Sequence, residues 1–293
     1  MRPFEVREAA VALLDAYRSG TPIPPLSTTY PSATIADAYR IQQEQVRSWS
    51  AAGDQVRGHK IGLVSAAIQR QMGVHEPDYG HLTASLFHPE HRPIPASAFI
   101  QPRIEPEIAF VLGAPLRGPG VTINDATRAV RHLLPALEIV DSRIRDWEIT
   151  IVDTIADNAS SGAVVLGTTP IDPAQVDLRS ANCALLRNGT VAETGTAAAV
   201  LGTPFHALTW LANAIGALGV SLEPGQIVLS GSLTRAITIA SGDRITADFP
   251  GIGTVTAVLA EHANELRHEP GAGVRRGPER RTDPPDTTST ATA

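Results

Sequence analysis

The hydrophobic pattern of the first fifty residues predicts two amphipathic helices. Between Phe4 and Ser19 the apolar residues recur every three or four positions, which places them on one helical face, and the glycine and prolines that follow end the helix. A second helix is expected from Ile35 to Trp49, because Thr34 and Asp37 form a capping pair at its start. Both helices are interpreted as packing elements.

The central part of the chain alternates short strand-like runs with short helical runs. Strands are predicted at residues 56–63, 101–112, 136–140 and 163–167. Helices are predicted at residues 65–72 and 122–134, each opened by a Ser or Thr that can cap it. The segment VHEPDYGHL between them is rich in turn residues and is expected to form a loop.

The second half of the chain is dominated by β patterns. Asn188-Gly189 is a strong signal for a hairpin, and a helix is expected over residues 204–218. Further short strands are predicted at residues 226–230, 236–240, 244–249 and 254–259. The pattern alone therefore predicts an α+β protein whose second half is rich in sheet.

Two carboxylates interrupt the strand QPRIEPEIAFVL. Glu105 and Glu107 are two residues apart, so they point to the same face of the strand. Two like charges that project together repel each other unless a cation lies between them, and hard oxygen ligands suit Mg²⁺ or Mn²⁺. The alternative is that both lie on the solvated face of an edge strand, marked by Pro106, with Arg103 as a counter-ion.

Glu138 is the candidate for a third ligand. It interrupts the apolar run ALEIV, which has the pattern of a buried strand, and a buried charge requires a partner. The three glutamates together favour a divalent-metal site.

Lys60 and Asp78 are the candidates for acid-base chemistry. Lys60 lies between Gly58 and Gly62 in an apolar run, where it is either a surface lysine that extends to solvent or a partly desolvated ammonium that transfers protons. Asp78 either orders its own turn or takes part in a site. His59 is interpreted as structural, and the spacing of the histidines matches no zinc motif.

Composition narrows the class of protein. The chain has 293 residues, 43% of them hydrophobic, which is ample for a buried core. The net charge of −6 and the scattered basic residues argue against nucleic-acid or membrane-surface binding. A single cysteine fits a reducing compartment, and no apolar run reaches the length of a membrane span, so a cytoplasmic location is expected.

Three motifs carry a resemblance to a known family. The segments RIEPEIAFVL, LPALEIVDSRIRDW and DTIADNASSG resemble the fumarylacetoacetate-hydrolase superfamily, and within it the 2-hydroxypenta-2,4-dienoate (2-oxopent-4-enoate) hydratases. The similarity runs from about residue 38 to about residue 259. It implies a mixed β-sandwich roll wrapped by the N-terminal helices.

The resemblance also implies roles for particular residues. Glu105, Glu107 and Glu138 would hold Mg²⁺ or Mn²⁺, while Lys60 and Asp78 would be catalytic. The substrate-binding candidates are Ser160, Gly231 and Ser232.

The implied reaction is metal-dependent addition of water to a 2-hydroxy-2,4-dienoate in the meta-cleavage catabolism of aromatic or steroid rings. The product would be a 4-hydroxy-2-oxo acid. The alternatives are the related 2-oxo-3-enedioate (4-oxalocrotonate) decarboxylase and a catalytically silent metal-binding subunit of a pathway complex. The resemblance further implies a homo-oligomer, which another meta-cleavage enzyme could join.

Three regions are expected along the chain. Residues 1–55 form an N-terminal helical segment, and residues 56–266 form the metal-binding catalytic domain. From residue 267 the sequence loses hydrophobic periodicity, so residues 267–293 are expected to be a disordered tail.

Overall fold

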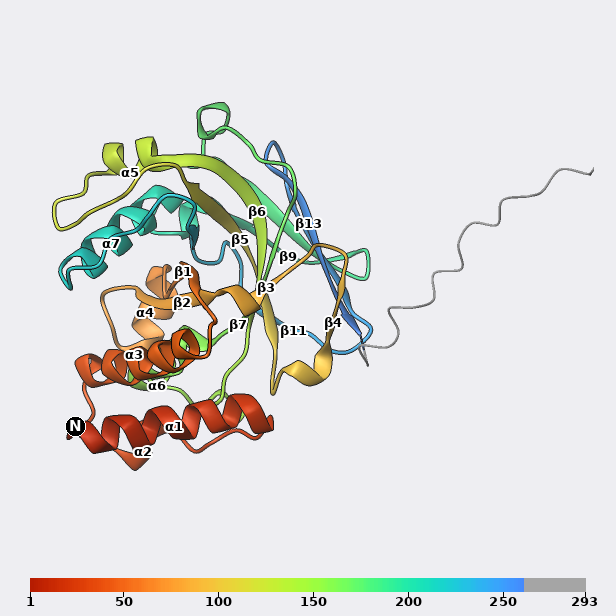
Figure 1. Cartoon of the computed structure of the whole chain (residues 1–293). Coiled ribbons are helices and arrows are strands. Elements are labelled where there is room, and N and C mark those ends of the chain that lie inside the picture. The colour runs from red at the N-terminus through yellow and green to blue at the C-terminus, as the bar shows by residue number, and fades with distance from the viewer. Residues whose placement is uncertain (261–293) are drawn as a thin grey trace, which may run out of the picture.

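Two curved β-sheets and a layer of helices make up the protein. The computed structural model describes residues 1–260, so the tail expected from residue 267 lies outside the described residues. Figure 1 shows the first helices on one side of the larger sheet and the smaller sheet on the other side. The predicted α+β class is confirmed.

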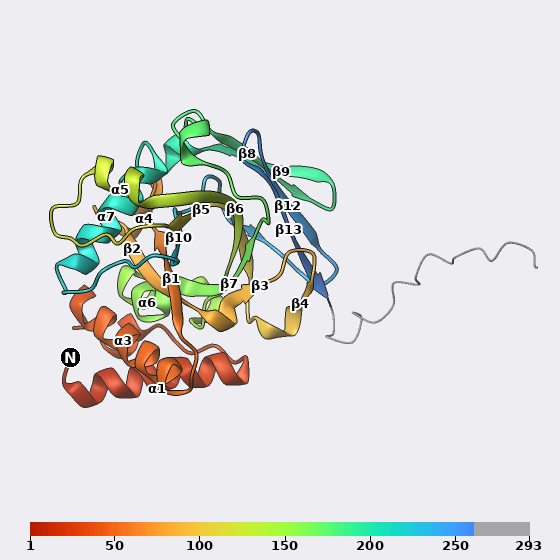
Figure 2. The same ribbon diagram turned by 45° about the horizontal axis from the view of Figure 1, so that its top comes forward.

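The larger sheet carries the strands that interrupt their apolar pattern with acids. Its strands run in the order β2-β1-β10-β5-β6-β7-β3, and β11 also pairs with β5. The sheet curls, so that in Figure 2 these strands follow one another around a common centre. Their bounds are β1 Val56–Gly62, β2 Asp78–Thr83, β3 Phe87–His88, β5 Arg103–Leu112, β6 Val130–Val140, β7 Ser161–Leu166, β10 Ile227–Leu229 and β11 Ile237–Thr238.

The smaller sheet has the order β4-β13-β12-β8-β9. Asn188 and Gly189 both have positive φ, 53° and 82°, which is the turn that the Asn-Gly signal predicted between β8 and β9. The strands of this sheet are β4 Pro93–Pro95, β8 Asn182–Arg187, β9 Thr190–Thr196, β12 Arg244–Phe249 and β13 Gly253–Ala260.

The helices begin at the caps that the sequence supplies. Thr34 and Asp37 form the expected capping box at the start of α3. The α-helices are α1 Pro3–Ser19, α2 Leu26–Thr29, α3 Ile35–Ala51, α4 Ala66–Met72, α5 Ile123–Ala129, α6 Ile151–Ala156 and α7 Pro204–Gly216. Short 3₁₀ turns occupy Ala84–Leu86, Ala96–Ala98, Arg145–Trp147, Asn158–Ser160, Pro173–Gln175 and Ala197–Ala199. None of the helices in residues 1–260 combines the length and apolar content that crossing a membrane requires.

Alternation along β5 divides the buried residues between two faces. Ile104, Ile108 and Phe110 belong to the main core, which includes residues of β12 and β13. The odd-numbered residues from Arg103 to Ala109 face the other way, into the curl of the larger sheet. A separate cluster joins α1 and α3 to α6 through Leu13, Ile41 and Ile155.

Two predictions about local structure were wrong. The helix expected to reach residue 134 ends at Ala129, because Val130 to Val140 pairs with β5 and β7 as strand β6. The loop expected over VHEPDYGHL instead becomes strand β2 from Asp78 onward, because these residues pair with β1. In both cases pairing between distant segments outweighed the local signal.

Candidate active site

Three glutamates from two neighbouring strands meet inside the curl of the larger sheet. Glu105 of β5 lies directly opposite Glu138 of β6, and Glu107 follows on the same face of β5. One carboxylate oxygen from each lies within 4.8 Å of the others. Glu107 and Glu138 are buried, and Glu105 is partly exposed. Because β5 is paired on both sides, the edge-strand alternative is wrong.

The electrostatics of this cluster are unfavourable without a cation. Burial and the neighbouring Glu138 raise the pKa of Glu105 to about 7, although Lys60 opposes the rise. Burial and the two other glutamates raise the pKa of Glu107 well above its usual value. Within residues 1–260, both carboxylate oxygens of Glu138 are buried and lack a hydrogen-bond partner of good geometry. Three such groups fit a hard divalent cation, which oxygen ligands bind and which would neutralise their charge.

Gly231 fixes one of the three carboxylates. Its amide donates a 2.6 Å hydrogen bond to Glu107 Oε2, and its φ of +95° is a conformation that glycine adopts readily. A Cβ at this position would lie 2.4 Å from the Val64 side chain. This contact differs from the substrate contact expected of Gly231, because the amide is already used by Glu107. The Ser232 hydroxyl is also used within the protein. It donates a hydrogen bond to the Thr234 carbonyl and accepts one from the Thr234 amide.

Lys60 lies beside the carboxylates and is buried. Its Nζ is 3.3 Å from Glu138 Oε2, and the side chain is 5% exposed, so the surface-lysine alternative is wrong. Burial alone would lower the pKa of Lys60, but the surrounding carboxylates, Glu138 first and Asp78 next, outweigh it and raise the pKa. The lysine is therefore held as an ammonium against the acids.

Asp78 begins strand β2 and faces Gly62 of β1. A Cβ on Gly62 would lie 2.2 Å from Asp78 Oδ1, so the glycine makes room for this carboxylate. Asp78 is 1% exposed, and its Oδ1 has no hydrogen-bond partner among the described residues. Burial raises its pKa, and the Lys60 charge counteracts part of that rise.

Ser160 lies in a turn whose backbone is unusual. Asn158, Ala159 and Ser160 all have φ between +51° and +55°, a region that costs energy for residues with a Cβ. The Asn158 side chain holds this turn to β2 by accepting from the His81 amide at 2.8 Å and donating to the His81 carbonyl at 2.9 Å. Ser160 itself is buried, with its hydroxyl 3.5 Å from that of Thr154.

The sequence indicated that SRIRDW is ion-paired, but not which arginine forms the buried pair that fixes this turn. Arg143, 1% exposed, donates from Nε to Asp157 Oδ1 at 2.6 Å and from Nη1 to the Ser161 carbonyl at 3.0 Å. Its guanidinium also lies 4.0 Å from the centre of the Tyr17 ring, so helix α1 contributes to the same network. The motif SRIRDW shows several charges, but nothing in it distinguishes the buried arginine from the exposed Arg145.

Two histidines occupy the opposite face of the sheet. His59 and His81 are cross-strand partners, their rings are 4.9 Å apart, and both are buried. Burial, and for His59 also its neighbour, lowers the pKa of both, that of His81 to about 4. They are therefore neutral at pH 7, which agrees with the structural role predicted for His59.

Acidification is expected to weaken the fold through these histidines. The folded-state pKa of these histidines lies below their unfolded value of about 6.5. Their contribution to the free energy of unfolding is therefore complete above pH 6.5 and is lost as the pH falls toward 4. For His81 the loss is about 1.4 kcal/mol per pH unit. Urea unfolding at several pH values, with a chelator present, measures it. His81→Gln should reduce the slope by that amount, and an unchanged slope would contradict the assignment.

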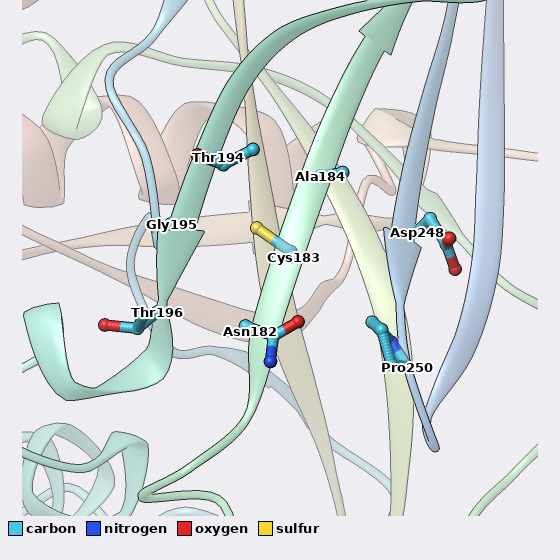
Figure 3. Close-up of a pocket in the computed structure, with 8 residues that line it drawn as sticks. All are labelled: Asn182, Cys183, Ala184, Thr194, Gly195, Thr196, Asp248 and Pro250. Atoms are coloured by element: carbon cyan, nitrogen blue, oxygen red, sulfur yellow. The ribbon is translucent and has the colours of Figure 1, made fainter.

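A hollow elsewhere on the surface is separate from the carboxylates. It has a volume of about 410 Å³ and lies on β8, β9 and β12 of the smaller sheet (Figure 3). Burial raises the pKa of Cys183, which lines it, to about 11, so its thiol is unreactive at neutral pH. The hollow is lined by Asn182, Cys183, Ala184, Thr194, Gly195, Thr196, Asp248 and Pro250.

Comparison with known proteins identifies the family. The family model described as fumarylacetoacetate (FAA) hydrolase C-terminal matches residues 50–260, which include every strand and all the candidate site residues. The chain belongs to the fumarylacetoacetate hydrolase family. The resemblance inferred from the three motifs is thereby confirmed.

Individual family members are similar over nearly their whole length. The 2-keto-4-pentenoate hydratase of Paraburkholderia xenovorans (strain LB400) is 44% identical over 87% of this chain and 95% of the relative. The 2-hydroxyhexa-2,4-dienoate hydratase of Comamonas testosteroni is 43% identical over 85% of this chain and 95% of the relative.

A solved structure confirms the fold expected for the family. The 4-oxalocrotonate decarboxylase from Pseudomonas putida G7, complexed with magnesium and adipate, superposes with a TM-score of 0.86 at 35% identity. The match covers 88% of this chain and 98% of the decarboxylase. The predicted fold of this chain, a β roll with packed N-terminal helices, is therefore confirmed.

Proposed function

We propose that this protein is a divalent-metal-dependent hydratase that adds water to a 2-hydroxy-2,4-dienoate and yields a 4-hydroxy-2-oxo acid. The observation that carries the proposal is the group of three clustered glutamates with the Lys60 ammonium 3.3 Å from one of them. The relatives named hydratases, at 43–44% identity, support this reaction. A ring meta-cleavage pathway is what the family resemblance implies for it.

Glu105, Glu107 and Glu138 would hold the cation, Mg²⁺ or Mn²⁺. When bound, the ion would supply Lewis-acid stabilisation to the adjacent carboxylate and 2-oxo oxygens of the substrate. Gly231 contributes by fixing Glu107 in place. The magnesium in the structure of the decarboxylase relative supports a hard divalent ion.

Lys60 would move the protons that the reaction requires. Ketonisation of the dienol delivers a proton to carbon, and addition of water at C4 removes a proton from water. Lys60 is buried beside the ligand carboxylates and is charged, so it can donate the first proton. Asp78, which acts on Lys60 electrostatically, would orient the lysine or the attacking water, and Ser160 would donate a hydrogen bond to the substrate carboxylate.

The second candidate function is decarboxylation of a 2-oxo-3-enedioate. The superposition on 4-oxalocrotonate decarboxylase favours it, because the two folds agree over nearly the whole of that chain. Both proposed reactions would use the same carboxylates and the same lysine. The higher identity to the hydratases places hydration first.

Product analysis distinguishes the two reactions. With Mg²⁺ or Mn²⁺ added, the protein should consume 2-hydroxypenta-2,4-dienoate, followed by its ultraviolet absorbance, and form a 4-hydroxy-2-oxo acid. It should release little CO₂ from 2-oxohex-3-enedioate. Faster CO₂ release than hydration would establish the decarboxylase instead, and inactivity on both substrates would favour the silent metal-binding subunit.

The other expectations that follow from the resemblance stay predictions. They are a homo-oligomeric assembly, a complex with another meta-cleavage enzyme, a cytoplasmic location and the domain boundaries at residues 55 and 266.

A further inference from the structure

Arg103 lies at the outer end of the carboxylate face. It precedes Glu105 by two residues on β5, so its side chain leaves the strand on the same side as Glu105 and Glu107. Each two-residue step is about 6.7 Å along the strand. Glu107 is buried, whereas Glu105 and Arg103 are both partly exposed, so this row is open to solvent on the side of the arginine.

The Arg103 guanidinium lies over the ring of Trp147. The Arg103 Cζ atom is 4.4 Å from the centre of the Trp147 ring. The indole N–H donates a 3.0 Å hydrogen bond to the Gln101 carbonyl, which anchors the ring. Trp147 and Asp146 both have φ of +56°, a conformation that persists only where surrounding contacts enforce it. The Trp147 ring is therefore held in position before a substrate binds.

The N–H groups of this guanidinium have no acceptor among residues 1–260. Within residues 1–260 the Arg103 side chain donates no hydrogen bond to the protein and lies within ion-pair distance of no carboxylate, although it is near enough to Glu105 to act on it electrostatically. The contact with the Trp147 ring leaves the N–H donors of the guanidinium without an acceptor in the described part of the chain. Such donors match the two oxygens of a carboxylate in a paired geometry.

The opposite end of the face offers no comparable opening. Ala109 follows Glu107 on the side away from Arg103, and Ala136 lies opposite Glu107. Together with Val164 and Leu229 they form an apolar cluster whose members are at most 1% exposed. Along this row only the Arg103 side is partly exposed, so the proposed substrate would extend its other end in that direction.

We propose that Arg103, lying over the ring of Trp147, binds a second carboxylate at the far end of the substrate. The enzyme would then accept 2-hydroxy-2,4-dienedioates as well as simple dienoates. The inference rests on the hydratase function proposed above and specifies the substrate class of that site. Arg103 is the specificity-determining residue in this arrangement, and Trp147 is a positioning residue.

Arg103→Gln tests the proposal by a ratio of specificities. The value of kcat/KM is measured for 2-hydroxyhepta-2,4-dienedioate and for 2-hydroxypenta-2,4-dienoate, in wild type and variant. Loss of a charge-assisted hydrogen bond should lower the dioate value by about ten- to a hundredfold, mainly through KM, and change the monocarboxylate value less than about twofold. Arg103→Lys should fall between, because it keeps the charge but loses the paired geometry.

Two controls make the result decisive. Arg131→Gln removes an exposed arginine from the neighbouring strand β6 and should leave the ratio unchanged. Calorimetric binding of adipate against hexanoate, with Mn²⁺ present, measures the same preference without turnover, so it still reports on Arg103 if the protein hydrates neither substrate. An unchanged ratio in Arg103→Gln, or an equal loss on both substrates or both ligands, would overturn the proposal.

Discussion

Glu107→Gln is expected to separate activity from stability. The variant should lose at least about a thousandfold in kcat, because the metal ion that Glu107 is proposed to hold would lower the barrier by several kcal/mol. In the presence of a chelator the same variant should be more stable than wild type. The reason is that replacing Glu107 removes one of three crowded, buried charges, while the amide oxygen of glutamine can still accept from Gly231.

Metal titration followed by thermal unfolding checks both halves of this prediction. Wild type should gain stability with added Mn²⁺ in proportion to the logarithm of its concentration, and Glu107→Gln should gain much less. Asp248→Asn is the matched control, since it removes an acid from a strand but at an exposed position. Normal Mn²⁺ dependence in Glu107→Gln, or in Glu138→Gln, would refute the three-carboxylate site.

Replacing Lys60 should abolish turnover and spare metal binding. General acid-base groups contribute about 10²–10⁴-fold, so Lys60→Ala should lose activity in that range. Lys60→Met keeps most of the volume of this buried side chain and should lose as much, which separates the missing ammonium from a packing defect. Affinity for Mn²⁺ should stay the same or increase, because a competing cation has been removed from beside Glu138.

Asp78→Asn supplies the comparison for Lys60. It preserves the shape of a side chain that Gly62 accommodates closely, so the fold should be retained. Turnover should fall with a smaller change in substrate binding, because the proposed role of Asp78 is to orient the groups that transfer protons. Full turnover of the dienoate in Lys60→Ala would show that the acid-base assignment is wrong, even though the family membership would stand.

The carboxylates could be found from the sequence because their signal is local. Two acids two residues apart in an apolar strand must share a face, and Glu138 contradicts the apolar run around it. The rest of the site depends on contacts between distant segments. In the sequence, Arg143 cannot be distinguished from the other arginines. Its role is evident only from its hydrogen bonds to Asp157 and Ser161 in the structure. Gly231 was expected to contact the substrate, and the sequence did not indicate that its amide would bind Glu107.

Errors in secondary structure had the same origin. The capping box at Thr122 is real and starts helix α5, yet the helix ends where β6 meets its two neighbouring strands. The residues before Asp78 do lie outside any strand, but those from Asp78 onward pair with β1 and so belong to the sheet. Local signals set where these elements begin, and pairing with other strands set how far they extend.

The hydrogen bond from Gly231 to Glu107 has a consequence for biosynthesis. The two residues are 124 positions apart, so Glu107 emerges well before the amide that fixes it has been made. At about 5–20 residues per second the delay is roughly 6–25 seconds. Strand β10, which lies between β1 and β5, also arrives late. During translation the acidic strand therefore lies beside an unfilled position in the sheet. The proposed catalytic centre is complete only when most of residues 1–260 have been synthesised.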